Sequence, residues 1–208
     1  MLNIMTNQQP SMPAAESPYI ADILAQPSVL DALLTSGLPE DVTSLLRTCG
    51  TFERIVLTGM GSSWFAADTM ARRLRRAGVH AVAELASVEA SYPADSSLTV
   101  VGVTASGTSK ETLEFLSAHS GTSRTIALTN NAVTLPVDHT MLMHAGEERG
   151  GVACVTYTHT LATLLQLEQQ LSGTVPDLPE KLELAANAIT VLHDTRGAWM
   201  RDVRAALT

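Results

Sequence analysis

The sequence predicts an α/β protein with three layers, in which a doubly wound sheet of five parallel strands carries helices on both faces. Three observations support this prediction. Short apolar runs rich in β-branched residues recur between residues 54 and 144, as expected for strands buried on both faces. An amphipathic segment or a turn-rich link separates each run from the next. Glycine and hydroxyl residues follow several of the runs, at the sheet edge where such folds bind ligands.

Each strand is assigned from its own apolar run, and the runs are 54–59, 79–85, 98–103, 124–129 and 140–144. Helices are expected over 64–76 after the first run, from about Ser109 after the third, and to about Leu171 after the fifth. Strands joined through helices run parallel with right-handed crossovers. The expected architecture is therefore flavodoxin-like.

Segments on either side of the sheet predict a tail and helical extensions. Residues 1–18, rich in Pro, Gln, Ser and Asn, are expected to form a disordered tail. Residues 19–50 predict N-terminal helices, with a break at Pro27 where a proline would start a second helix. The sheet domain then covers residues 51–172, and residues 173–208 form a C-terminal helical extension.

The composition argues against several classes of function. A formal net charge of −8 disfavours binding to nucleic acid or to anionic membranes. Only Cys49 and Cys154 occur, and they stand far apart, which suggests neither a disulfide framework nor a zinc site. Because disulfides are rare in the reducing cytoplasm, the cytoplasm is the expected location. The histidines show no metal-ligand spacing, so no metal is expected. No run is long enough to span a bilayer, and the N-terminal segment lacks the features of a secretory signal.

The third run leads into a stretch of small hydroxyl residues, 104–109 (TASGTS), that opens a helix. Thr108 and Glu111 have the spacing of a capping box, and Ser109 is the alternative N-cap. Backbone N–H groups and the helix dipole at such a turn attract an anion, best of all a phosphate. The alternative is an ordinary strand-to-helix turn, since Ser and Thr are common N-caps. A nucleotide-hydrolysing site is not expected, because Thr108 stands where a Walker loop needs lysine.

A second hydroxyl-rich loop, 59–63 (GMGSS), follows the first run. Together with Glu84 it partly matches a dinucleotide fingerprint. Trp64 replaces the third glycine of that fingerprint, and its bulk would keep the helix away from the sheet, so no nicotinamide cofactor is expected. Ser62 and Ser63 are instead expected to bind a sugar or its phosphate, alongside the hydroxyls of the first loop.

A third loop, residues 145–154, is rich in glycine and contains Glu147 and Glu148. One of these carboxylates could act as a base on a bound sugar. The alternative is a solvated pair in an exposed turn. No G-x-S-x-G elbow supports serine nucleophilic chemistry.

These motifs together resemble the sugar isomerase (SIS) domain family, and most closely the first of the two such domains in the isomerase half of glucosamine-6-phosphate synthase. Residues 23–27 (ILAQP) look like the family's opening E-I-x-E-Q-P segment, and residues 61–63 (GSS) look like its G-T-S loop. Residues 104–112 (TASGTSKET) look like S-Q-S-G-E-T-x-D-T. Residues 146–154 (GEERGGVAC) look like G-T-E-x-G-V-A-S with one extra residue. The motifs occur in the family's order, which makes the match specific.

The resemblance implies that the hydroxyl loops bind a sugar phosphate and that the backbone of Val152 lies close to the sugar. Ala105, Thr108 and Cys154 differ from the family pattern, which suggests altered sugar contacts around a retained anion site. Glu148 is the candidate catalytic residue. The implied binding residues are Ser62, Ser63, Thr104, Ser106, Gly107, Thr108, Ser109 and Val152.

The predicted function is phosphosugar binding, in the aldose–ketose isomerisation, deamination or transamination of hexose or hexosamine phosphates. In the two-domain relatives the acid and base groups come from a second SIS domain. The apolar stripes of the helices expected over 19–34 and 179–207 also need cover beyond one small sheet, so a homodimer or a partner with a second SIS domain is expected. No cofactor is expected. The alternative function is that of a non-catalytic sugar-phosphate sensor or regulatory subunit.

Overall fold

The computed structural model describes residues 17–48, 54–89 and 92–207. Its five strands form one sheet in the order β2-β1-β3-β4-β5, with every neighbouring pair parallel. This is the flavodoxin-like order, so the predicted fold class is confirmed. The strands are β1 (Arg54–Gly59), β2 (Ala81–Leu85), β3 (Leu98–Val103), β4 (Arg124–Thr129) and β5 (His139–Leu142).

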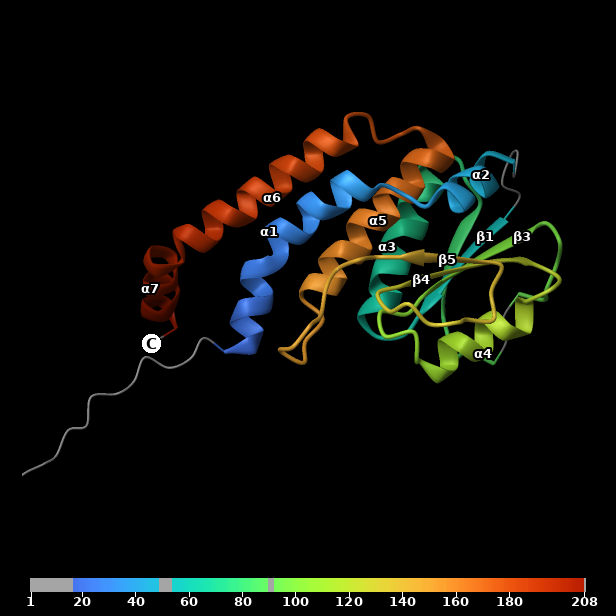
Figure 1. The fold of residues 1–208 in the computed structure, drawn as a ribbon, viewed down its shortest axis with the longest axis horizontal. Coiled ribbons are helices and arrows are strands. Elements are labelled where there is room, and N and C mark those ends of the chain that lie inside the picture. The colour runs from blue at the N-terminus through green and yellow to red at the C-terminus, as the bar shows by residue number, and fades with distance from the viewer. Residues whose placement is uncertain (1–16, 49–53, 90–91, 208) are drawn as a thin grey trace, which may run out of the picture.

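Helices cover both faces of the sheet, as predicted (Figure 1). The helix α4 packs on one face, and α3 and α5 pack on the other, with α1 and α6 stacked outside α5. The helix α7 follows at the far end of α6 and has no buried residue. The helices are α1 (Pro18–Ser36), α2 (Glu40–Thr48), α3 (Ser62–Arg76), α4 (Lys110–His119), α5 (Val155–Ser172), α6 (Leu178–Asp194) and α7 (Arg196–Ala206).

The core is divided by the sheet, because successive side chains of a strand point to opposite faces. On the α3 and α5 side the strands contribute Ile55, Leu57, Val101, Val103, Ile126 and Leu128. On the α4 side they contribute Val56, Leu98, Val100 and Ala127, which meet Phe115 and Leu116. Strands that are apolar on both faces explain why their sequences read as continuous hydrophobic runs.

The outer helices share a smaller core of their own. Leu30 and Leu33 of α1 pack with Leu178 and Leu182 of α6, and Ala162 of α5 joins them. This arrangement holds α1 against the helix that follows the third loop, which matters for the site described below.

Two details of the helices differ from the sequence prediction. The expected break at Pro27 is absent, because α1 runs through this proline as one helix that changes direction along its length (Figure 1). Proline leaves one carbonyl of the preceding turn without its helical donor, and packing on both sides of α1 holds the helix together despite that loss. The helix α3 begins at Ser62, so both serines of the second loop lie in its first turn. Residues 1–16 of the predicted disordered tail lie outside the described residues.

Candidate functional site

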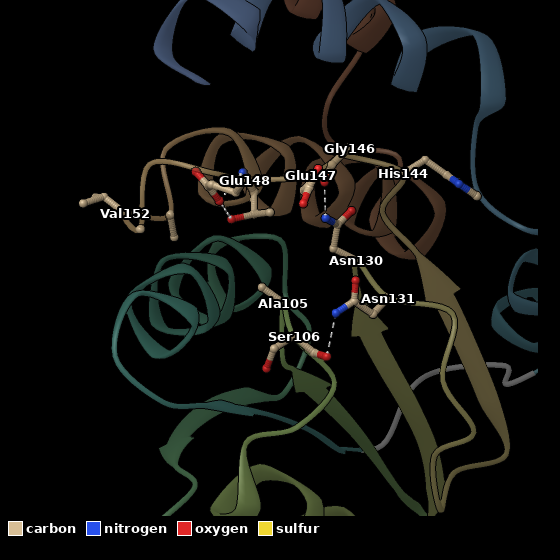
Figure 2. Close-up of a pocket in the computed structure, with 12 residues that line it drawn as sticks. Ala105, Ser106, Asn130, Asn131, His144, Gly146, Glu147, Glu148 and Val152 are labelled. Carbon is tan, nitrogen blue, oxygen red and sulfur yellow. Dashed lines mark hydrogen bonds between the residues drawn. The ribbon is translucent and has the colours of Figure 1, made fainter. Parts of the chain in front are cut away.

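A cavity of about 810 Å³ lies at the carboxyl ends of β3, β4 and β5, where the start of α5 faces the sheet edge (Figure 2). Parallel sheets of this type bind ligands at that edge. The lining is polar and apolar in about equal measure and comes from the ends of three strands, the third loop and the first turn of α5. It consists of Ala105, Ser106, Asn130, Asn131, His144, Gly146, Glu147, Glu148, Gly151, Val152, Ala153 and Thr156.

Two asparagines directly after β4 tie the walls of the cavity together (Figure 2). Asn130 donates from Nδ2 to the carbonyl of Gly146 at 2.6 Å and accepts at Oδ1 from the backbone N–H of Ala145 at 2.8 Å. Asn131 donates from Nδ2 to the carbonyl of Ser106 at 2.9 Å. The amide side chains therefore fix the third loop and the hydroxyl loop relative to the same strand.

Glu148 lies in the third loop, and its carboxylate caps the N-terminus of α5. It accepts from the backbone N–H of Val155 at 2.8 Å and of Thr156 at 3.4 Å, and also from the Cys154 N–H and the Thr156 hydroxyl. A negative charge is favourable at this end of a helix, and three of the four bonds satisfy backbone N–H groups at the helix start, whereas the fourth comes from a side-chain hydroxyl. In this arrangement Glu148 serves as an anionic cap that shapes the loop, and its oxygens are occupied by donors of its own chain.

The other ionisable groups of the cavity face outward or are paired. Glu147 is exposed and accepts from Arg149 Nε at 2.9 Å. His144 is exposed, and Figure 2 shows its imidazole directed away from Asn130 and Asn131. Among the cavity-lining residues, the groups placed to contact a ligand are thus mainly amides, hydroxyls and backbone, which bind and orient a substrate.

The hydroxyl loop at residues 104–109 ends at an uncapped helix. Ser109 is the N-cap of α4, but its hydroxyl bonds to Thr112 Oγ1 at 3.0 Å and approaches Glu111 Oε2 at 3.4 Å, and it caps no backbone N–H. The predicted capping box between Thr108 and Glu111 is therefore wrong. Instead, Thr108 shares its hydroxyl with that of Ser106 at 2.8 Å. The first-turn N–H groups of α4 are left without a side-chain acceptor.

Gly107 lets this loop turn tightly over β4. Its φ is +70°, and a Cβ at this position would lie 2.6 Å from Val133 Cγ2. The neighbouring Thr104 is 3% exposed, and its hydroxyl has no hydrogen-bond partner among the described residues. A buried hydroxyl without a partner costs free energy unless a ligand or water satisfies it.

The second hydroxyl loop lies at the end of β1, next to β3 in the sheet. Gly61 is the N-cap of α3 and has no side chain to cap the helix. In its first turn the N–H groups of Ser63 and Trp64 donate to the backbone carbonyls of Met60 and Gly61, both at 3.1 Å, so this helix start has no anionic side chain of its own. Ser62 and Ser63 stand in this first turn. The starts of α3 and α4 follow adjacent strands on either side of the point where the strand order reverses.

The structure brings part of the predicted site together. Ser106, Glu148 and Val152 line one cavity, whereas the serines of the second loop and Thr104, Gly107, Thr108 and Ser109 do not. Val152 is 55% exposed, and its side chain points away from the other labelled residues in Figure 2. The sequence analysis missed Asn130, Asn131 and His144. The available signal was a pair of polar residues directly after a buried strand.

Within residues 17–48, 54–89 and 92–207, no three His, Cys, Asp or Glu side chains gather closely enough to hold a metal ion. No helix in these ranges has both the length and the apolar character needed to cross a bilayer.

No family model matches the sequence. The chain is 29% identical to glutamine–fructose-6-phosphate aminotransferase (isomerizing) of Pyrococcus horikoshii, over 79% of this chain and 30% of that protein. It resembles a proposed phosphosugar isomerase from Silicibacter pomeroyi with a TM-score of 0.70 and 21% identity, over 84% of this chain and 56% of the other.

Two further structures share the fold. The C-terminal domain of glucosamine-fructose-6-phosphate aminotransferase from Francisella tularensis gives a TM-score of 0.69 at 16% identity, covering 94% of this chain and 59% of the other. The Vibrio vulnificus NanR protein, complexed with ManNAc-6P, gives a TM-score of 0.57 at 19% identity, covering 83% of this chain and 70% of the other. The chain thus spans about a third of the curated relative and little more than half of the first two structures.

Proposed function

We propose that this chain, which has the fold of an SIS domain and resembles the isomerase half of a glucosamine-6-phosphate synthase, binds a phosphorylated sugar at the carboxyl edge of its sheet. The phosphate would lie against the first turns of α4 and α3. The contacts would come from Ser106, Gly107, Thr108 and Ser109 on one side, and from Ser62 and Ser63 on the other, with Thr104 beneath. The sugar would extend into the cavity, toward Asn130, Asn131 and the backbone around Val152.

The observation that carries this proposal is the difference between three helix N-termini at one sheet edge. The start of α5 is filled by the Glu148 carboxylate, whereas the starts of α3 and α4 have no side-chain cap. Backbone N–H groups at a helix start favour an anion. Because the chain supplies its own anion only at α5, the other two starts are the places for a ligand's phosphate. The hydroxyls that surround them add donors without adding charge.

The proteins that share this fold support a phosphosugar as the ligand. Their names include two aminotransferases of fructose 6-phosphate and a complex with ManNAc-6P. The loop differs from the family pattern at Ala105 and Thr108, and its glycine, Gly107, has a φ of +70°.

We propose that the chain binds the phosphosugar and that acid–base groups for isomerisation, deamination or transamination come from a second SIS domain, in a partner or in a second copy. Proton transfer between adjacent carbons needs a base within reach of the substrate, and the carboxylate of Glu148 is engaged at α5. That engagement also favours a second candidate function, a sugar-phosphate sensor, in which binding occurs without turnover.

A thermal-shift experiment tests the proposal. Fructose 6-phosphate and glucosamine 6-phosphate should raise the melting temperature, and free fructose and glucosamine should not. A ligand at a hundred times its Kd stabilises the folded state by about 2.7 kcal/mol, which is readily measured. Ser106→Asp should abolish the shift because it places a negative charge beside the phosphate position.

Ser117→Asp is the control, since Ser117 is exposed on α4, the helix that follows the hydroxyl loop, and lies far from its first turn. It should keep the ligand-induced shift. Equal stabilisation by free sugars would refute the phosphate site. Robust turnover by the purified chain alone would refute the sensor function, and turnover only after addition of a protein with a second SIS domain would support the divided enzyme.

A further inference from the structure

The helix α1 contacts the third loop through a buried carboxylate. Asp22 is 5% exposed, and its Oδ2 accepts from the backbone N–H of Arg149 at 2.9 Å and of Gly150 at 2.6 Å. Both donors are in the loop that carries the cavity wall. A buried carboxylate that accepts two backbone bonds holds its partners firmly, because charge-assisted bonds are stronger than neutral ones and an unpaired buried charge is costly.

The loop is also shaped to reach α1. A Cβ on Gly150 would lie 2.4 Å from the Cα of Tyr19 and 2.9 Å from its backbone nitrogen. Only glycine can bring the backbone this close to the first turn of the helix. The approach places the Gly150 N–H within reach of Asp22.

A second residue of α1, one helical turn after Asp22, holds the other end of the same segment. Gln26 donates from Nε2 to the carbonyl of Cys154 at 3.1 Å and to Thr158 Oγ1 at 3.1 Å. Residues four apart lie on one face of a helix. This face of α1 thus holds both ends of residues 149–154, between which lie the cavity residues Gly151, Val152 and Ala153.

We propose that Asp22 and Gln26 are positioning residues. They hold residues 149–154, which form one wall of the cavity, so that α1 helps to shape the binding site. Asn130 fixes the start of the third loop from the sheet, and α1 fixes its end from the opposite side. The consequence for ligand affinity rests on the proposed phosphosugar function. The consequence for loop order does not depend on it.

Hydrogen exchange on the full chain tests loop order without any ligand. In Asp22→Ala the amides of Arg149 and Gly150 should exchange about tenfold faster or more, while amides of β1 and β3 keep their protection. Asp22→Asn retains an oxygen at the same place and should restore most of the protection. Asp31→Ala, at an exposed position of the same helix, is the control and should change neither amide. Unchanged exchange in Asp22→Ala would overturn the proposal.

Titration with fructose 6-phosphate tests the consequence for the site. Asp22→Ala should weaken binding about tenfold, with Asp22→Asn close to the unaltered chain. Gln26→Ala, a second variant in case Asp22→Ala does not fold, should weaken binding in the same direction. Equal affinity in Asp22→Ala, Gln26→Ala and Asp31→Ala would overturn the role of α1. If the unaltered chain binds no phosphosugar, the proposed function fails, and faster exchange in Asp22→Ala still supports α1 as the holder of this wall.

Discussion

The buried His159 should make the protein lose stability as the pH falls from 7 to 5. This residue of α5 is 0% exposed, and neither ring nitrogen has a hydrogen-bond partner among the described residues. Burial lowers the pKa of His159 from 6.5 to about 4; the Met143 backbone opposes this shift, and the electrostatic effect of His144 adds to it. The native state therefore resists protonation that the unfolded chain accepts.

The sign and size of the effect follow from linkage. Above pH 6.5 the imidazole is neutral in both states and the lowered pKa has no effect. Between pH 6.5 and about 4 the unfolded chain binds a proton that the native protein does not. The free energy of unfolding therefore decreases as the pH is lowered through this range. One unit of pKa is worth about 1.4 kcal/mol, which gives a loss of roughly 2 kcal/mol by pH 5. That is a large share of the typical stability of about 5–15 kcal/mol for a folded domain.

Urea unfolding followed by circular dichroism at pH 7 and pH 5 measures this loss. His159→Leu removes the titrating ring and the unpartnered nitrogens, so the difference between the two pH values should shrink by about 2 kcal/mol relative to the unaltered chain. His80→Leu is the control, because His80 is exposed and should leave the difference unchanged. If His159→Leu lost as much stability between pH 7 and pH 5 as the unaltered chain, the reasoning would be refuted.

Two more predictions concern the third loop. Glu148→Gln should lower the free energy of unfolding by about 1–2 kcal/mol, because it removes the charge that caps α5. Glu147→Gln, at an exposed position, is the control and should leave the free energy of unfolding unchanged. Urea titration measures both variants, and equal stabilities would contradict the capping role. Burial raises the pKa of the Cys154 thiol, and the carboxylates of Glu148 and Asp22 raise it further. In a Cys49→Ser background, Asp22→Asn should therefore lower the pKa of the Cys154 thiol and speed its alkylation at constant pH. If the alkylation rate of Cys154 were the same at every pH with and without the substitution, the Asp22 charge would have no effect on the thiol.

The sheet could be predicted from sequence because each strand carries its own local signal. Strands such as Leu98–Val103 are apolar on both faces, and the glycine and hydroxyl turns mark their ends. The effect of Pro27 was mispredicted, because the local rule for proline takes no account of the packing of α1 between α5 and α6.

The candidate site was harder to predict because its key contacts join distant parts of the chain. Asp22 and Gly150 are 128 residues apart, and no spacing rule connects them. Glu148 looked like a solvated or catalytic carboxylate, since the sequence does not show that its loop folds back onto the start of α5. The resemblance to SIS domains located the loops, and the structure showed which groups hold them in place.

The third loop takes its shape from contacts that leave three of its residues exposed. Its fixed points are the Asn130 amide, the Asp22 carboxylate, the Gln26 amide and the cap on α5. Gly151, Val152 and Ala153 lie between these points, are exposed and line the cavity. Substitutions at Val152 and Ala153 therefore change the surface offered to a ligand with little cost to folding. A descendant of this protein could exchange one ligand for another through these two positions while keeping the same scaffold.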